Sequence, residues 1–209
     1  MTNLIAKHGG FRNLKSFQSA QISYDFTFHF CQKFVPAHKM RDQLEGAARS
    51  GVQNIAEGSS TSGTSKQSEI RLVTVARASL DELLLDFEDF LRQRGLNKWD
   101  KNDERVLKIR QLAYTENRTY KTYETYMTNA EAAANCAICI INQANFLLDR
   151  QLKTLEQDLA KNGDFKERIK EQQKDQIFNS NDDFDDFLNS FNLKRLPNGQ
   201  VVTKDEQDK

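Results

Sequence analysis

The hydrophobic residues of this chain recur at three- and four-residue steps over long stretches, which is the spacing of one face of an α-helix. Four stretches carry this pattern and predict long helices at about residues 14–35, 39–57, 65–95 and 131–161. The 209 residues include only two prolines and nine glycines, which is too little turn punctuation for a strand-rich fold. The pattern therefore predicts an all-α protein built as a helical bundle.

Residues that interrupt helical backbone mark the ends of these helices. Pro36 is expected to end the first helix, and Gly58 is placed to follow the second in a left-handed conformation. Gly95 is expected to end the third helix. Thr64, with Gln67 three residues later, is compatible with a capping box at the start of the third helix.

The segment between the third and fourth helices breaks the pattern. Residues 96–130 are predicted to form an insertion with a short helix at about 103–114, and Trp99 is expected to anchor its entry. Residues 11–161 then form the four-helix bundle with its insertion, and residues 162–209 form a charged, partly disordered C-terminal extension.

Charge is distributed unevenly although the formal net charge is zero. Residues 1–120 hold 18 Lys and Arg against 14 Asp and Glu, and residues 162–209 hold 8 against 11. The body is therefore mildly basic and the tail acidic, which is compatible with anion binding by the body but far from the balance of a strongly basic nucleic-acid-binding protein.

The acidic tail contains an aromatic row. Its apolar residues lie at i, i+3, i+4 and i+7, namely Phe184, Phe187, Leu188 and Phe191. This is the spacing of a helix that docks into a groove of a protein partner. The alternative is a tail that folds back on its own bundle or stays disordered.

The chain carries no residue pattern that points to catalysis. Cys136 and Cys139 form a C-x-x-C pair, but they fall inside an apolar helix, so we expect buried structural thiols. His8, His29 and His38 lack metal-ligand spacing. We therefore expect no enzyme, no metal and no cofactor.

Two further features bear on location. No hydrophobic run approaches the roughly 20 residues of a membrane span, and residues 1–10 lack the apolar core of a signal peptide. Three cysteines form an odd count with no disulfide framework, which fits a reducing compartment. We expect a cytoplasmic protein with no membrane partner.

The junction of the second and third helices carries the most specific motif. It reads Asn54-Ile55-Ala56-Glu57-Gly58, followed by Ser65, Glu69, Ala78-Ser79-Leu80 and Glu82-Leu83. With this motif, residues 11–95 and 131–155 resemble the four-helix-bundle proteins encoded within intervening sequences of bacterial 23S ribosomal RNA genes. Arg94-Gly95-Leu96, Trp99-Asp100, Asn142-Gln143 and Leu147-Leu148-Asp149 look like the subgroup called four-helix-bundle suffix proteins.

This resemblance implies an antiparallel up-down-up-down four-helix bundle that assembles as a ring-like homo-oligomer, a pentamer, in bacterial cytoplasm. A more distant relative is the accessory variability protein of diversity-generating retroelements, which binds a reverse transcriptase and nucleic acid through a basic surface. The chain departs from the family pattern at Glu45 and Gly46, where a basic pair is usual, and at Val52, which replaces a common proline.

Two functions follow as hypotheses. The first is a non-enzymatic homo-oligomer that binds nucleic acid, with RNA as the leading ligand, as an accessory to an RNA-processing or reverse-transcribing partner. The second is a protein-protein interaction scaffold that uses the aromatic tail and binds no nucleic acid.

The nucleic-acid hypothesis rests on positive residues in or near the first three helix starts. The candidates are Arg12, Lys15, Arg41, Arg49, Lys66 and Arg71. On a monomer they form a solvated face, whereas in a ring of identical subunits they repeat around the axis as a basic collar. The loop from Gly58 to Ser65 offers a phosphate site at a helix start, with a plain polar connector as the alternative.

Four residues form the structural signature of the junction: Asn54, Glu57, Gly58 and Arg77. Arg77 interrupts the apolar row of the third helix, and a buried arginine needs a partner. We expect this partner to be Glu57 or Asn54. The alternative is that Arg77 faces the bore of an oligomer.

Overall fold

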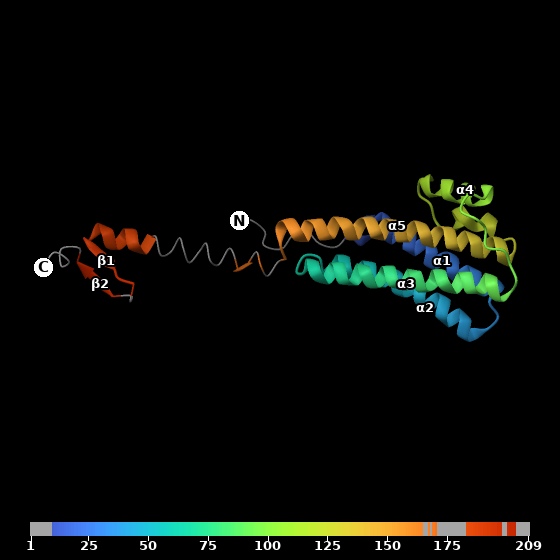
Figure 1. Ribbon diagram of the computed structural model, residues 1–209, viewed down its shortest axis with the longest axis horizontal. Helices are drawn as coiled ribbons and strands as arrows, with labels where there is room; N and C mark the ends of the chain where they lie inside the picture. Colours follow the sequence, from blue (N-terminus) through green and yellow to red (C-terminus); the bar gives the residue numbers. More distant parts are fainter. Residues whose placement is uncertain (1–9, 165–166, 168, 171–182, 198–199, 204–209) are drawn as a thin grey trace. The chain divides into compact units, whose positions relative to one another are not determined.

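Helices make up most of the described chain in the computed structural model (Figure 1). The model describes residues 10–164, 167, 169–170, 183–197 and 200–203. The longest elements are α1 (Lys15–Phe34), α2 (His38–Thr61), α3 (Lys66–Gln93) and α5 (Ala130–Asn162), and the 3-10 turn η1 (Phe11–Asn13) precedes α1. The prediction of a mainly helical protein is confirmed, and the four long helices lie close to their predicted bounds.

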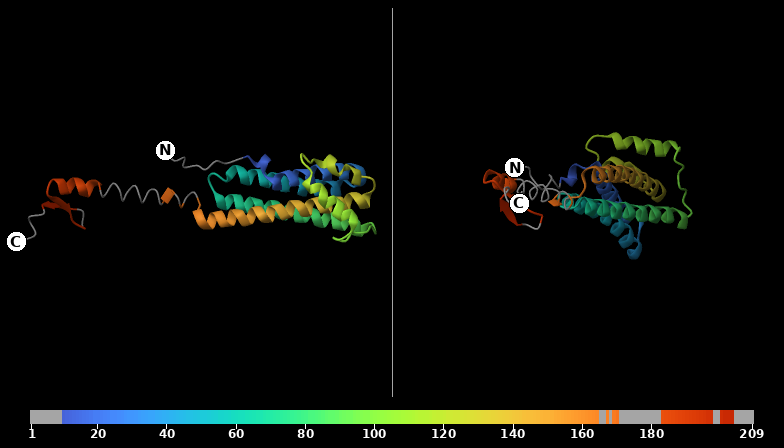
Figure 2. Two further views of the ribbon diagram at one scale, coloured as in Figure 1. Left: turned by 90° about the horizontal axis from the view of Figure 1, so that it is seen from above. Right: turned by 60° about the vertical axis from the view of Figure 1, so that its left-hand side comes forward.

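The four long helices lie side by side around one core, as the two views of Figure 2 also show. Contacts join α1 to α2, α2 to α3, α3 to α5 and α5 back to α1. The ring of Phe30 in α1 lies 4.9 Å from Phe87 and 4.9 Å from Phe90 in α3, edge to face in both pairs. Such pairs add about 0.5–1.5 kcal/mol beyond the buried area.

Two buried glycines let α2 and α3 approach closely. A Cβ atom at Gly51 would lie 2.7 Å from Cδ2 of Leu80, and one at Gly58 would lie 3.3 Å from the carbonyl oxygen of Glu69. Gly51 thus has a packing role, since any larger side chain at this position meets the fully buried Leu80.

Two predictions about the ends of these helices are wrong. The helix α2 continues through Gly58 to Thr61, because Gly58 is held in helical backbone by its packing against α3 and does not adopt a left-handed conformation. The N-cap of α3 is Ser65 and not Thr64, since the Ser65 hydroxyl accepts from the backbone N–H of Ser68 at 3.1 Å.

The insertion follows Gly95, whose φ of 64° ends α3 as predicted. It contains α4 (Glu104–Gln111), η2 (Leu112–Tyr114) and η3 (Tyr120–Tyr126), and both α4 and η3 contact α5. Trp99 anchors its entry, as predicted. The indole Nε1–H donates to Oε1 of Glu131 at 3.0 Å, and the Trp99 backbone N–H donates to Oδ1 of Asn135 at 2.8 Å.

The chain from Gly163 onward forms a second unit. Its described part has a helix over residues 183–190 and an antiparallel hairpin of β1 (Leu193–Arg195) and β2 (Val201–Thr203), with Lys194 opposite Val202. The sequence does not predict this hairpin, because three-residue strands are too short to show an alternating pattern.

All three cysteines are buried and free. Burial raises the pKa of Cys31 to about 12 and that of Cys139 to about 11, and it raises the pKa of Cys136 well above the ordinary value. These thiols therefore stay protonated near neutral pH, as expected for structural cysteines in a helix interior.

Thiol reactivity checks this interior. We expect Cys31 and Cys136 of the native protein to resist a maleimide at about pH 8, because both thiols are fully buried and protonated, and we expect all three cysteines to react in denaturant. The unfolded chain loses these protons near the ordinary pKa of 9.0, before the folded chain does. The free energy of unfolding should therefore fall as pH rises from about 9 toward 11. Rapid labelling of Cys31 or Cys136 in the native protein at pH 8 would contradict their buried placement.

Candidate functional site

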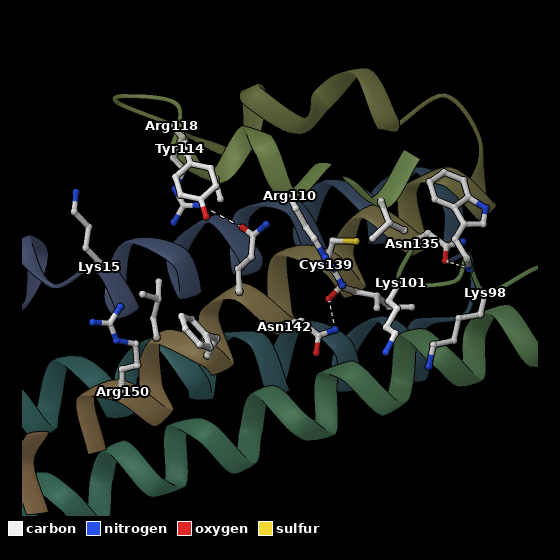
Figure 3. Close-up of a pocket in the computed structure, with 17 residues that line it drawn as sticks. Lys15, Lys98, Lys101, Arg110, Tyr114, Arg118, Asn135, Cys139, Asn142 and Arg150 are labelled. Carbon is white, nitrogen blue, oxygen red and sulfur yellow. Dashed lines mark hydrogen bonds between the residues drawn. The ribbon is translucent and has the colours of Figure 1, made fainter. Parts of the chain in front are cut away.

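A groove of about 710 Å³ lies between α5 and the insertion (Figure 3). Residues of α5 at three- and four-residue steps, from Asn135 to Arg150, line one side of it. The insertion lines the other side from Lys98 to Arg118, and Lys15 joins from the start of α1. A helical stretch of this length makes the groove about 22 Å long at 1.5 Å per residue.

Positive charge runs along the whole groove. Six cations line it, namely Lys15, Lys98, Lys101, Arg110, Arg118 and Arg150, whereas no aspartate or glutamate among the described residues does. Figure 3 shows Lys15, Arg118 and Arg150 toward one end, Lys98 and Lys101 toward the other, and Arg110 between them. Such a one-sign cleft with low-dielectric walls concentrates anions. An extended anion fits this arrangement better than a single compact one.

Two of the six cations already have partners. The ammonium of Lys98 lies 2.5 Å from Oε1 of Glu88. The guanidinium of Arg118 donates to the Ser19 hydroxyl in α1, and at 3.3 Å each to the Tyr123 hydroxyl and to Oε1 of Gln143 in α5. Arg118 therefore joins the insertion to two helices and positions this wall of the groove.

The other four cations are available to a ligand. Within the part of the chain that the structure describes, Lys15, Lys101, Arg110 and Arg150 take part in no ion pair. All four are exposed. An anion in the groove could thus form ion pairs with these four side chains without breaking an existing salt bridge.

Two aromatic side chains stand exposed among these cations. Tyr114 has 89% of its surface exposed and Phe146 has 60%. The guanidinium of Arg150, one turn further along α5, lies 5.9 Å from the centroid of the Phe146 ring. The groove therefore pairs flat apolar faces with positive charge, which is the combination that binds nucleic-acid bases and phosphates.

Trp99 also lines the groove but is already engaged. The guanidinium of Arg105 lies 3.8 Å from its ring centroid, and its indole N–H is bonded to Glu131. Trp99 therefore belongs to the wall of the groove, whereas the rings of Tyr114 and Phe146 stand exposed.

Only one of the six cations predicted as a nucleic-acid surface lies in this groove, namely Lys15. The guanidinium of Arg12 lies 4.7 Å from the Phe11 ring, and Arg49 and Arg71 are exposed on α2 and α3. These side chains sit on different helices, and the described chain does not gather them into one site.

Two of the predicted cations are tied to protein groups. Lys66 forms ion pairs with Glu69 at 3.0 Å and with Asp158 at 3.4 Å. Arg41 donates to the carbonyl oxygen of Val35 at 2.9 Å, which places it at the far end of α1, about 30 Å from Lys15. Arg41 and Lys15 therefore lie at opposite ends of α1, and the collar around an oligomer axis stays a prediction.

The predicted partner of Arg77 is wrong. The Nε–H of Arg77 donates to Oδ1 of Asp149 at 2.9 Å, and its guanidinium also pairs with Asp81. Arg77 thus faces α5, while Asn54 is satisfied within α2 by the carbonyl oxygen of Ser50 at 2.9 Å. The expected need for a partner is confirmed, but the partners are carboxylates of α3 and α5 and not residues of α2.

The predicted phosphate loop is largely absent from this structure. Because α2 extends to Thr61, only residues 62–65 connect it to α3. The plain connector is therefore the better interpretation of this segment.

Glu57, the remaining signature residue, is exposed on the last turns of α2.

The aromatic row of the tail lies on the helix over residues 183–190 and just beyond it. Phe184, Phe187 and Phe191 are exposed and their rings lie in sequence, 6.4 Å and then 5.0 Å apart. Leu188 is buried instead. Arg195 in β1 lies over Phe184 at 5.7 Å, so the hairpin packs beside one end of the row.

Most residues of the groove were not predicted from the sequence. Its new members include Lys101, Arg110 and Tyr114 in the insertion and Phe146 and Arg150 in α5. Each looks like an ordinary solvated position of its own helix or turn, and only the docking of the insertion on α5 brings them together. The one feature of the sequence that could have indicated a binding surface was the mixture of cations and tyrosines between residues 98 and 123.

The described residues contain no cluster of three or more His, Cys, Asp and Glu side chains that could hold a metal ion. Likewise, none of the helices in this part of the chain is long and apolar enough to cross a membrane.

Known proteins give no further guide. Comparison with protein-family models, curated proteins and solved structures finds no match.

Proposed function

We propose that this protein is a non-enzymatic helical bundle that binds nucleic acid, with RNA as the leading ligand, through the groove between α5 and the insertion. The observation that carries the proposal is the run of six cations, without a carboxylate among the described lining residues, over about 22 Å. A phosphate backbone is a linear anion, and its affinity for protein is dominated by such cations.

The lining of the groove favours binding over chemistry. It offers no histidine and no carboxylate among the described residues to act as a general base. Cys139 reaches the groove, but burial raises the pKa of its thiol to about 11, so it is no nucleophile near neutral pH.

The resemblance to the intervening-sequence and suffix proteins supports the finer parts of the proposal. These are the antiparallel up-down-up-down topology, assembly into a ring of five in the cytoplasm, and an accessory role beside an RNA-processing or reverse-transcribing partner. A ring would repeat the groove around its axis and raise avidity for a long nucleic acid.

A salt titration of binding tests the proposal. Purified protein is examined by light scattering and by its 260/280 nm absorbance ratio, before and after nuclease, and then titrated with a labelled oligonucleotide at several salt concentrations. Four available cations predict a slope of log affinity against log salt of about −3, at roughly −0.7 per phosphate of a single strand. A slope near zero, or no binding, would contradict it.

The aromatic tail supports a second function, a scaffold that recruits another protein. Three exposed phenylalanines of the helix and its end provide an apolar face, and their neighbours Asp183 and Asp186 are exposed as well. An apolar contact survives high salt, whereas phosphate binding does not. A protein complex that persists through the same salt titration, free of nucleic acid, would favour the scaffold.

A further inference from the structure

We propose that the groove takes a single-stranded segment and stacks one of its bases on Phe146, an inference that rests on the nucleic-acid binding proposed above. The geometry points to a single strand because the groove offers aromatic faces as well as cations. Cations alone would serve either a duplex or a single strand.

Phe146 has no packing role that explains its position. It is 60% exposed, although its neighbours Asn145 and Leu148 are buried against the core. The only ring or cation contact it makes within the described chain is with Arg150, at 5.9 Å. Tyr114 stands even more exposed on the opposite wall. One exposed aromatic residue is ordinary, but two that line the same cationic groove are a stacking platform.

A duplex cannot use these rings. Its base faces are stacked on one another inside the helix, so a duplex would offer the groove only phosphates and sugars. A single strand or an RNA loop presents its base faces, which stack on aromatic side chains irrespective of sequence.

The spacing of the cation and the ring also suits a strand. Phe146 and Arg150 are four residues apart on α5 and so lie on the same face of the helix. A base on Phe146 would have its phosphates within reach of Arg150 on one side and of Arg110 further along the groove. At about 3.4 Å per stacked nucleotide, a groove of about 22 Å holds at most roughly six nucleotides.

The test compares one sequence in two forms. Fluorescence anisotropy measures binding of a labelled RNA of about ten nucleotides as a single strand and as a blunt duplex, at about 100 mM salt. The variant is Phe146→Ala, and the matched control is Phe28→Ala, which removes another exposed phenylalanine, on α1 and outside the groove lining. Phe146→Leu keeps an apolar side chain but removes the flat ring, and it replaces Phe146→Ala if that variant fails to fold.

We expect the single strand to bind more tightly than the duplex. Phe146→Ala should weaken single-strand binding by about 5-fold or more and leave duplex binding unchanged, since stacking is worth about 1–3 kcal/mol per base. Phe28→Ala should change neither. A polyglutamate competitor of equal charge should displace the strand poorly.

Four results would overturn the inference. Equal binding of both forms, or no effect of Phe146→Ala or Phe146→Leu, would refute stacking while leaving the proposed function in place. Efficient displacement by polyglutamate would show that the groove recognises charge alone. Failure of both RNA forms to bind would refute the proposed function together with the inference.

Discussion

Replacing Arg110 and Arg150 together by glutamate is expected to lower the affinity for a single-stranded oligonucleotide by about 100-fold at about 50 mM salt. Each phosphate contact to a single strand contributes about −0.7 to the slope of log affinity against log salt. Lowering the salt from 1 M to 50 mM therefore raises the affinity by roughly 8-fold for each contact. Two lost contacts give about 60-fold, and repulsion by the two new carboxylates adds to it. Both arginines are exposed and take no part in an ion pair among the described residues, so the fold should persist.

The matched control reverses two cations that lie elsewhere. Arg49→Glu with Arg71→Glu makes the same change in net charge on exposed positions of α2 and α3. We expect at most a few-fold loss from this pair, through the general field of the protein. Only the groove pair should also make the slope of log affinity against log salt less steep, by about 1.4. If the control pair loses as much affinity as the groove pair, the nucleic acid binds the predicted collar and not the groove.

Replacing Gly51 by valine is expected to lower the free energy of unfolding by about 3 kcal/mol, near the upper end of the usual cost of overpacking. A Cβ atom there would lie 2.7 Å from Cδ2 and 2.9 Å from Cγ of Leu80, which is fully buried and cannot turn away into solvent. The two branches of valine add further atoms at the contact of α2 with α3. Urea unfolding followed by far-UV circular dichroism measures the change.

Gly46 supplies the matched position for this test. It lies five residues earlier in the same helix, is exposed, and would have nothing within 4 Å of an added Cβ atom. Gly46→Val should therefore change the free energy of unfolding by no more than about 0.5 kcal/mol. Equal losses at the two glycines would mean that valine acts through helix propensity and that α2 and α3 are less closely packed than described.

The features that were predicted correctly depend on residues close together in the sequence. The bounds of α1, α3 and α5 follow from apolar periodicity, and the anchoring role of Trp99 followed from its place at the start of the insertion. The conformation of Gly58 was predicted wrongly because it depends on a packing contact with α3, which no local pattern records.

The groove lay beyond sequence reasoning for the same reason. Arg110 and Arg150 are forty residues apart and belong to elements that meet only when the insertion docks. The partner of Arg77 posed the same problem, since Asp149 lies on α5 and not on the helix adjacent in the chain. Periodicity says which face of a helix is buried but not which element covers it.

The wall that the insertion builds is fixed at three places. Trp99 fastens its entry, Val106 and Ile109 of α4 are buried, and Arg118 joins its far end to α1 and α5. The width of the groove is therefore set before a ligand arrives, and the entropy cost of ordering falls on the ligand alone. If the groove binds nucleic acid as proposed, it should discriminate between ligands by their stiffness. An RNA loop that is already closed by its own stem would lose less conformational entropy on binding than an unstructured single strand of the same sequence.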